Sequence, residues 1–307
     1  MNDEMCQFFE SLWADFPDTL DEDGNYKFKN DDINETYCKD NIDNCATDLD
    51  KINVACFVLF ETFFKDSDSF TNHAKNNINI AGYILAWLSY ILSLKENEEI
   101  NNLNDFYKKY IKDKKMYNNH ITGVNGYTSY QNLIDKYKEL MTIDIKNIPN
   151  FYAPLKSLCN MYAILYTNDN NCTKYSDYAK EFAQKYNELN EDPKNNENNS
   201  YKNVLYSLSN NYNNLKRHLS ENCRNSSDIS SFPEIKAPQG PFEIFEATPS
   251  SSLIASILIP VLSIFVAIPI FLRIAYKYSL FGFDKRLHRQ YLREKIKKIK
   301  KKMNNYI

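Results

Sequence analysis

The sequence predicts an all-α protein: a helical-bundle ectodomain with disulfides, an extended stalk, one C-terminal transmembrane helix and a basic cytoplasmic helix. Three observations lead to this prediction. Apolar residues recur every three or four positions through most of the first 220 residues, which is typical of helices that bury one face. No stretch before residue 253 shows the sustained alternation of a half-buried strand. One uncharged run of twenty residues is long enough to cross a bilayer.

Residues 1–220 are expected to form one helical domain. A short apolar cluster around Trp13 predicts a first helix, which ends before Pro17 and the acidic turn that follows. A longer helix is predicted from Tyr37 to Phe64, because its apolar residues form one core-facing stripe: Ile52, Cys56, Leu59, Phe60 and Phe63. Further stripes predict helices near residues 106–111, 133–148, 155–166, 178–189 and 204–219.

Residues 78–94 form the second most apolar run, and their hydrophobic side chains cover every face of a helix. The run has seventeen residues, which is at the short limit for a membrane span, and acidic residues follow it directly. We therefore predict a central buried helix of the domain, with a second span as the alternative.

Two segments lack this periodicity. Residues 190–200 are polar and predict a flexible loop between helices. Residues 221–252 contain four prolines and several serines, a composition typical of an extended stalk. At about 3.1 Å per residue, such a stalk could reach roughly 100 Å. We expect it to lift the domain off the membrane.

The transmembrane helix is predicted to begin at Leu253 and to end at Leu272. Twenty helical residues span roughly 30 Å, the thickness of a membrane core. Fourteen of the twenty are Leu, Ile, Val or Phe. Their gross insertion gain is about 4 to 8 kcal/mol, which Pro260, Pro269 and two serines reduce without reversing. This helix requires a lipid bilayer as a partner.

Residues 273–307 are predicted to form a basic cytoplasmic tail. They carry twelve Lys or Arg against two acidic residues, whereas residues 221–252 carry two basic and five acidic ones. By the positive-inside rule, the tail is cytoplasmic and the N-terminal domain lies on the opposite side of the membrane. A basic amphipathic helix here would bind an anionic inner membrane surface, and a stop-transfer signal is the simpler alternative. The lysines and arginines that define the tail include Lys285, Arg286, Arg289, Arg293, Lys295, Lys297, Lys298, Lys300, Lys301 and Lys302.

Composition and cysteine content favour an extracytosolic domain. Residues 1–272 carry 25 basic and 38 acidic residues, and this negative net charge disfavours nucleic-acid partners. The start of the sequence shows no signal-peptide pattern, so the C-terminal span is expected to act as the targeting signal unless export is unconventional. The sequence has no C-x-x-C pair that would indicate a zinc site, so we expect disulfides. The number of cysteines is odd, so at least one is left over, and the pairing stays open. The seven are Cys6, Cys38, Cys45, Cys56, Cys159, Cys172 and Cys223.

Motifs of catalysis are missing from the sequence. Its six glycines include no G-x-G or G-K-[ST] context, and there is no G-x-S-x-G or H-E-x-x-H. We therefore expect no catalytic residues, no cofactor and no metal.

Four stretches resemble the Plasmodium interspersed repeat (PIR) family, in particular its CIR/YIR/BIR branch. The tail block, residues 276–307, is similar nearly throughout, with Asp284 where another basic residue is expected. Three domain blocks also resemble the family: DLDKINVACFVLFETFF at 48–64, YILAWLSYILSL at 83–94 and LKSLCNMY at 155–162. Val54 and Ala55 depart from the small-residue pair that usually precedes the cysteine. The resemblance implies a variant antigen of a malaria parasite, exported to the infected red cell or parasite surface and associated with immune evasion.

Three functions follow as hypotheses. The first is a surface-displayed module whose domain meets a host receptor or antibody, anchored by the span. The second is a membrane scaffold or adaptor that works through its basic tail. The third and most remote is an enzyme. The sequence leaves the oligomeric state and the host ligand open.

Overall fold

The computed structural model describes residues 3–33, 38, 45–145, 150–166, 172–192, 198–222 and 232–247. These residues all belong to one compact unit, residues 1–250. Their helices are α1 (Asp3–Asp15), α2 (Asn30–Ile33), α3 (Asp48–Phe64), α4 (Ser67–Asn72), α5 (Ile80–Ser93), α6 (Leu103–Phe106), the π-helix η2 (Tyr107–Ile111), α7 (Tyr130–Asp135), α8 (Lys138–Met141), α9 (Tyr152–Tyr166), α10 (Cys172–Glu191) and α11 (Asn199–Asn222). Within this part of the chain the other regular pairings are three isolated β-bridges, so the all-α prediction for the domain is confirmed.

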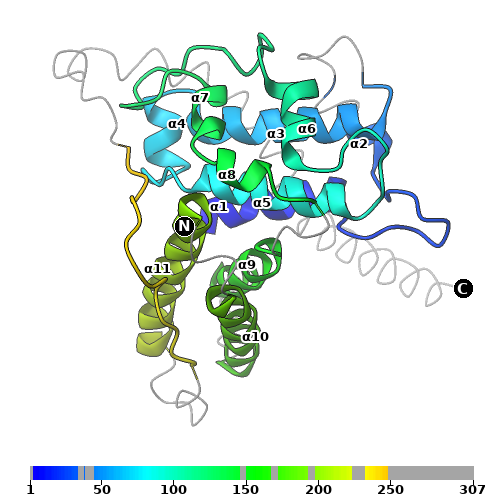
Figure 1. Ribbon diagram of the computed structural model, residues 1–307. Helices are drawn as coiled ribbons and strands as arrows, with labels where there is room; N and C mark the ends of the chain where they lie inside the picture. The colour runs from blue at the N-terminus through cyan, green and yellow to red at the C-terminus, as the bar shows by residue number, and fades with distance from the viewer. Residues whose placement is uncertain are drawn as a thin grey trace, which may run out of the picture. The chain divides into compact units, whose positions relative to one another are not determined.

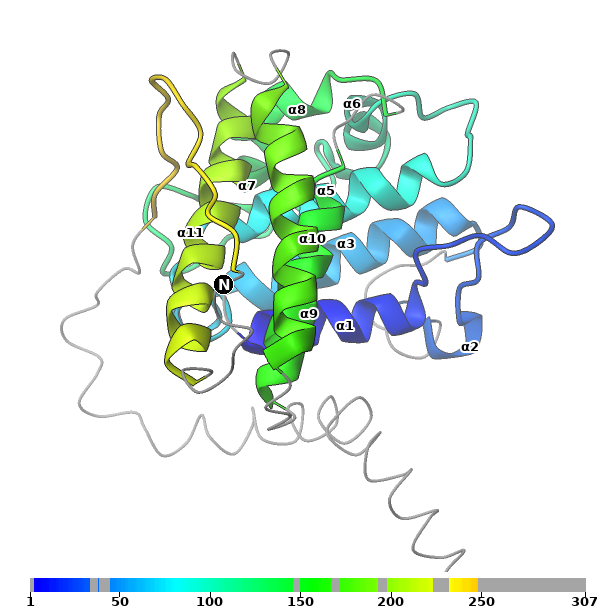
Figure 2. The ribbon, with the colours of Figure 1, turned by 90° about the horizontal axis from the view of Figure 1, so that it is seen from below.

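The long helices form two crossing sets. Helices α1, α3 and α5 lie side by side, and α9 and α10 run across them (Figure 2). Helix α9 contacts both α1 and α5, and α11 contacts α5, α8 and α9 (Figure 1). One continuous core lies where the two sets meet.

Local capping starts α3 at Asp48, so the predicted start at Tyr37 is wrong, and capping also separates α3 from α4. The hydroxyl of Thr47 accepts from the Asp50 amide at 3.1 Å, and the Asp50 carboxylate accepts from the Thr47 amide at 2.9 Å. This capping box satisfies two backbone donors that the first turn leaves free. The carboxylate of Asp66 then caps α4 by accepting from the Ser69 amide at 2.8 Å.

Helix α5 is the central buried helix that the sequence predicts. Twelve of its fourteen residues are buried, including the whole of Trp87. Gly82 is required by close packing, because a Cβ there would lie 2.8 Å from Val204 Cγ2 and 2.9 Å from Tyr137 Cε1. Among the described residues, no helix combines the length and the apolar character needed to cross a membrane.

The predicted helix over residues 133–148 is wrong in detail. Helix α7 ends at Asp135, α8 begins at Lys138, and Tyr137 between them has φ −102° and ψ 19°, outside the helical region. The break lets the Tyr137 ring pack against Gly82 while its hydroxyl donates to Asn79 Oδ1 at 3.2 Å. Tertiary packing therefore overrides the apolar periodicity here.

The segment expected to be a stalk differs from that expectation where it is described. Helix α11 continues to Asn222, two residues into it. Residues 232–247 have no regular secondary structure and lie along α11 (Figure 1), with Phe232, Ile235 and Phe245 buried. The composition suggested extended backbone but did not reveal that these three apolar side chains hold it on the domain.

Candidate functional site

Two disulfides tie the N-terminal part of the domain. Cys6 of α1 and Cys159 of α9 are bonded, with Cα atoms 5.1 Å apart, and both side chains are fully buried. This bond links the two crossing sets of helices across 153 residues of sequence. Cys38 and Cys45, seven positions apart in the sequence before α3, are also bonded. Cys172 is also disulfide-bonded, and Cys223 lies outside the described residues.

Cys56 is free and buried on α3. Burial raises the pKa of its thiol to about 12, although a hydrogen bond with Tyr117 acts to lower it. A thiol with this pKa stays protonated at neutral pH and is a poor nucleophile. Among the described cysteines, Cys56 is the one without a disulfide bond, and its buried side chain packs in the core.

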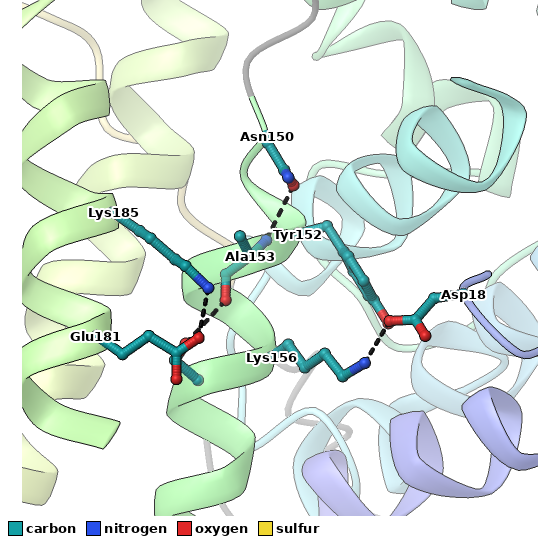
Figure 3. A network of polar contacts seen from close by, with 8 residues as sticks. Asp18, Asn150, Tyr152, Ala153, Lys156, Glu181 and Lys185 are labelled. Atoms are coloured by element: carbon teal, nitrogen blue, oxygen red, sulfur yellow. Dashed lines mark hydrogen bonds and ion pairs between the residues drawn. The ribbon is translucent and has the colours of Figure 1, made fainter. Parts of the chain in front are cut away.

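A polar cluster joins the loop after α1 to α9 (Figure 3). The Lys156 ammonium pairs with the Asp18 carboxylate, to which the Tyr152 hydroxyl also donates at 3.0 Å. Lys156 Nζ lies 5.8 Å from the ring centroids of both Trp13 and Tyr152. Burial alone would raise the pKa of Asp18, but the hydrogen bond and charge of Lys156, with the Tyr152 hydroxyl, hold it below its ordinary value. The carboxylate is thus fixed in its charged form as an anchor for the loop.

Figure 3 also shows contacts along the α9–α10 pair. The side chain of Asn150 accepts from the Ala153 amide at 3.0 Å at the start of α9, and Lys185 pairs with Glu181 within α10. These groups all have partners, so the network stabilises helix starts and packing.

A cavity of about 1000 Å³ opens between α3, the end of α5 and η2. Apolar and aromatic side chains form part of its wall, including Phe57, Leu92 and Tyr110. Its charged lining residues are balanced between four acids and four lysines: Asp48, Asp50, Glu96, Glu99, Lys95, Lys109, Lys114 and Lys115.

Part of that charge is already engaged. Asp50 belongs to the capping box of α3, and Glu99 pairs with Lys109. The described lining residues include neither histidine nor cysteine, and no cluster of metal-ligating side chains is found among the residues that the structure describes. The lining therefore suits contact with a polar or aromatic group of a partner. This cavity could not be predicted from the sequence, because its wall comes from segments up to 93 residues apart, from Tyr26 to Asn119.

The remaining predicted site residues cannot be compared with coordinates. Leu253 and Leu272, the ends of the predicted span, and the basic tail from Lys285 to Lys302 lie outside the described residues. Of the seven cysteines, the structure brings together Cys6 with Cys159 and Cys38 with Cys45.

Comparison with known proteins identifies the family of the chain. The family described as "Plasmodium variant antigen protein Cir/Yir/Bir" matches over residues 6–277. A solved structure described as "Structure of a Plasmodium PIR protein ectodomain" is similar to this chain with a TM-score of 0.51 and 27% sequence identity. The similarity covers 78% of this chain and 99% of the solved one. No curated protein matches the chain.

The solved ectodomain shares the helical fold described above, and the family match extends over most of the sequence, including the apolar run at residues 253–272. The chain therefore belongs to the Cir/Yir/Bir family of Plasmodium variant antigens, within the PIR proteins.

Proposed function

We propose that this protein is a single-pass membrane antigen that displays its helical domain at the surface of the infected red cell or the parasite, for host interaction or immune evasion and without catalysis. The observation that carries the proposal is the family match, which runs from the disulfide-bonded domain through the apolar run to residue 277. The boundaries are those of the sequence: a span at residues 253–272 and a tail at residues 273–307.

The chemistry of the domain supports placement outside the cytosol. Disulfides persist in oxidising compartments and are rare in the cytosol. The bond between Cys6 and Cys159 is buried between α1 and α9, where it supports the packing of the core. The basic tail, on the other side of an uncharged run, fits the cytoplasmic face.

Selective labelling of the two ends tests the topology. One epitope tag is inserted in the exposed turn near Gly24 and another follows Ile307, and infected cells are stained before and after permeabilisation. We expect the Gly24 tag to be stained on intact cells and the Ile307 tag only after permeabilisation. Staining of both tags on intact cells would contradict a single crossing, and absence of the Gly24 tag from intact cells would contradict display at the surface.

A scaffold that works through the tail is the second candidate, and the density of lysine in the tail favours it. Replacing six tail lysines by glutamine leaves the apolar run intact: Lys295, Lys297, Lys298, Lys300, Lys301 and Lys302. The scaffold predicts loss of captured cytoplasmic partners in this variant, whereas the antigen predicts unchanged binding of host ligands or antibodies. Glutamine at six exposed lysines of the domain that lie outside the cavity is the matched control for loss of positive charge: Lys27, Lys29, Lys112, Lys136, Lys138 and Lys180.

A further inference from the structure

Residues 232–247, here called the strap, are held on α11 by asparagine side chains. The Asn203 amide donates from Nδ2 to the Glu243 carbonyl at 2.7 Å, and its Oδ1 accepts from the Phe245 amide at 2.7 Å. The side chain of Asn199, one turn earlier, accepts from the Glu243 amide at 2.8 Å and donates to the Glu243 carbonyl at 3.2 Å. Two asparagines thus pair with the strap as a neighbouring strand would.

The other end of the strap is held by tyrosine hydroxyls. Tyr212 of α11 donates to the Pro233 carbonyl at 2.9 Å, and Tyr186 of α10 donates to the Lys236 carbonyl at 2.9 Å. Since Pro233 lies beside Tyr212 and Phe245 beside Asn203, the strap runs antiparallel to α11, as Figure 1 also shows.

Buried side chains add to these hydrogen bonds. Phe232, Ile235 and Phe245 are at most 9% exposed. The Phe245 ring meets the Tyr137 ring edge to face, with centroids 5.2 Å apart. Because both ends and the middle of the strap are fixed, the folded domain extends past the end of α11 to at least residue 247.

This anchoring changes the length of chain that separates the domain from the predicted span. From Ala247 to Leu253 there are six residue steps, which reach at most about 20 Å when fully extended. If the chain left the domain at Asn222, the 31 steps to Leu253 could reach about 100 Å. We propose that the strap holds the domain at the surface of a phospholipid bilayer, in place of the long stalk that the composition suggested. This inference rests on the proposed membrane anchor.

One exposed side chain supports a lipid surface as the partner of the strap end. Ile244 is 40% exposed, the one large hydrophobic residue exposed to this degree among the described residues. It lies between Glu243 and Phe245, the two residues that the asparagines hold, and nine residues before Leu253. Apolar side chains at the edge of an anchored domain are suited to the interface of a bilayer.

Energy transfer from the domain to the membrane tests the inference. The full chain is reconstituted in phosphatidylcholine vesicles that contain an acceptor-labelled lipid, and a donor dye is attached to an unnatural amino acid at Lys138, an exposed residue of α8. Helix α8 contacts α11, whose first residues hold the end of the strap. We expect strong transfer in the native chain.

Two variants change the tether in different ways. Asn199→Ala combined with Asn203→Ala removes the asparagine pairing, and a Gly/Ser insertion of about twenty residues after Ala247 lengthens the tether while the strap stays docked. Both should lower transfer, since a flexible chain of n residues spans about 5–6 Å × √n. The matched control, Asn210→Ala with Asn213→Ala, changes exposed asparagines of the same helix and should leave transfer unchanged.

The outcomes separate this inference from the proposed anchor. Vesicle flotation is measured first, and failure of the native chain to float contradicts the anchor itself. If the chain floats but transfer is weak, or if the insertion leaves transfer unchanged, the docked strap does not set the height of the domain. The insertion variant keeps the test decisive even if the asparagine double variant fails to fold.

Discussion

Helix α5 and the strap at residues 232–247 both pack on α11, but different forces hold them. Helix α5 is enclosed on nearly all sides, and its contacts are mainly apolar, as the complete burial of Trp87 shows. The strap has one buried face, and its backbone pairs with asparagine and tyrosine side chains. The comparison teaches that a helix can be held by apolar burial on nearly all sides, whereas a segment without regular structure needs side-chain hydrogen bonds to its backbone in addition to its three buried side chains.

The two segments bind different polar side chains of α11. Tyr83 of α5 donates to Ser207 Oγ at 2.7 Å and accepts from Asn211 Nδ2 at 2.8 Å, both on α11. Four residues or more before these, Asn199 and Asn203 of the same helix hold the strap. Helix α11 therefore presents polar side chains to two different neighbours.

The largest effect is expected from Trp87→Ala, which removes the bulkiest fully buried side chain of α5. A cavity of this kind costs about 3–5 kcal/mol of the free energy of unfolding. Urea unfolding of the full chain in detergent, followed by circular dichroism, measures the loss. Ile244→Ala is the control on the strap, because its exposed side chain should change stability by less than about 0.5 kcal/mol. Equal losses in the two variants would remove the contrast between core and strap.

A slightly smaller effect is expected when the bond between α1 and α9 is removed. Cys6→Ala with Cys159→Ala opens a cross-link between residues 153 positions apart, which typically costs about 2–4 kcal/mol. Cys56→Ala is the control, since it removes a buried sulfur that forms no disulfide. The same unfolding measurement applies. A loss no greater than that of the control would show that the helix sets are held together without this bond.

An intermediate effect is expected for Tyr83→Phe. Loss of two hydrogen bonds to α11 should cost about 1–3 kcal/mol. Burial also raises the pKa of Tyr83 above its ordinary value, so this residue contributes stability that is complete below about pH 10 and is lost as the pH rises through the folded pKa.

The pH dependence checks the cause of that effect. The free energy of unfolding of Tyr83→Phe should fall less steeply above about pH 10 than that of the native chain. Tyr178→Phe is the control, because Tyr178 is only partly buried. An unchanged alkaline slope in Tyr83→Phe would show that other tyrosines govern the loss.

The smallest effect on global stability is expected for Asn203→Ala. Asn203 is buried, but the strap lies at the edge of the domain, so its freed backbone groups can reach water and the loss in urea unfolding should be about 1 kcal/mol. Hydrogen exchange at the Phe245 amide should nevertheless become much faster, because Asn203 Oδ1 is its acceptor. Amides of α5 should be unaffected. A strap amide that stays protected would mean that the buried Phe245 ring alone holds the segment.

Much of the domain was predictable from the sequence, because the apolar periodicity of a helix is visible within a short stretch of residues. The stripe from Ile52 to Phe63 predicted α3, and the apolar residues at 78–94 predicted a buried α5. The family resemblance was likewise carried by local blocks of sequence and is confirmed by the match over residues 6–277. The span and tail remain predictions from length and charge.

Tertiary structure decided the features that depend on distant partners. Seven cysteines allow many pairings, and only the placement of α1 against α9 joins Cys6 to Cys159. The periodicity at residues 133–148 continues through Tyr137, but the helix is interrupted there. The Tyr137 ring packs against Gly82 of α5, and the backbone of Tyr137 leaves the helical conformation. Proline and serine content predicts an extended segment, but whether such a segment is free depends on what lies beside it. Here Asn199 and Asn203, some 40 residues earlier, supply the partners that extended backbone requires.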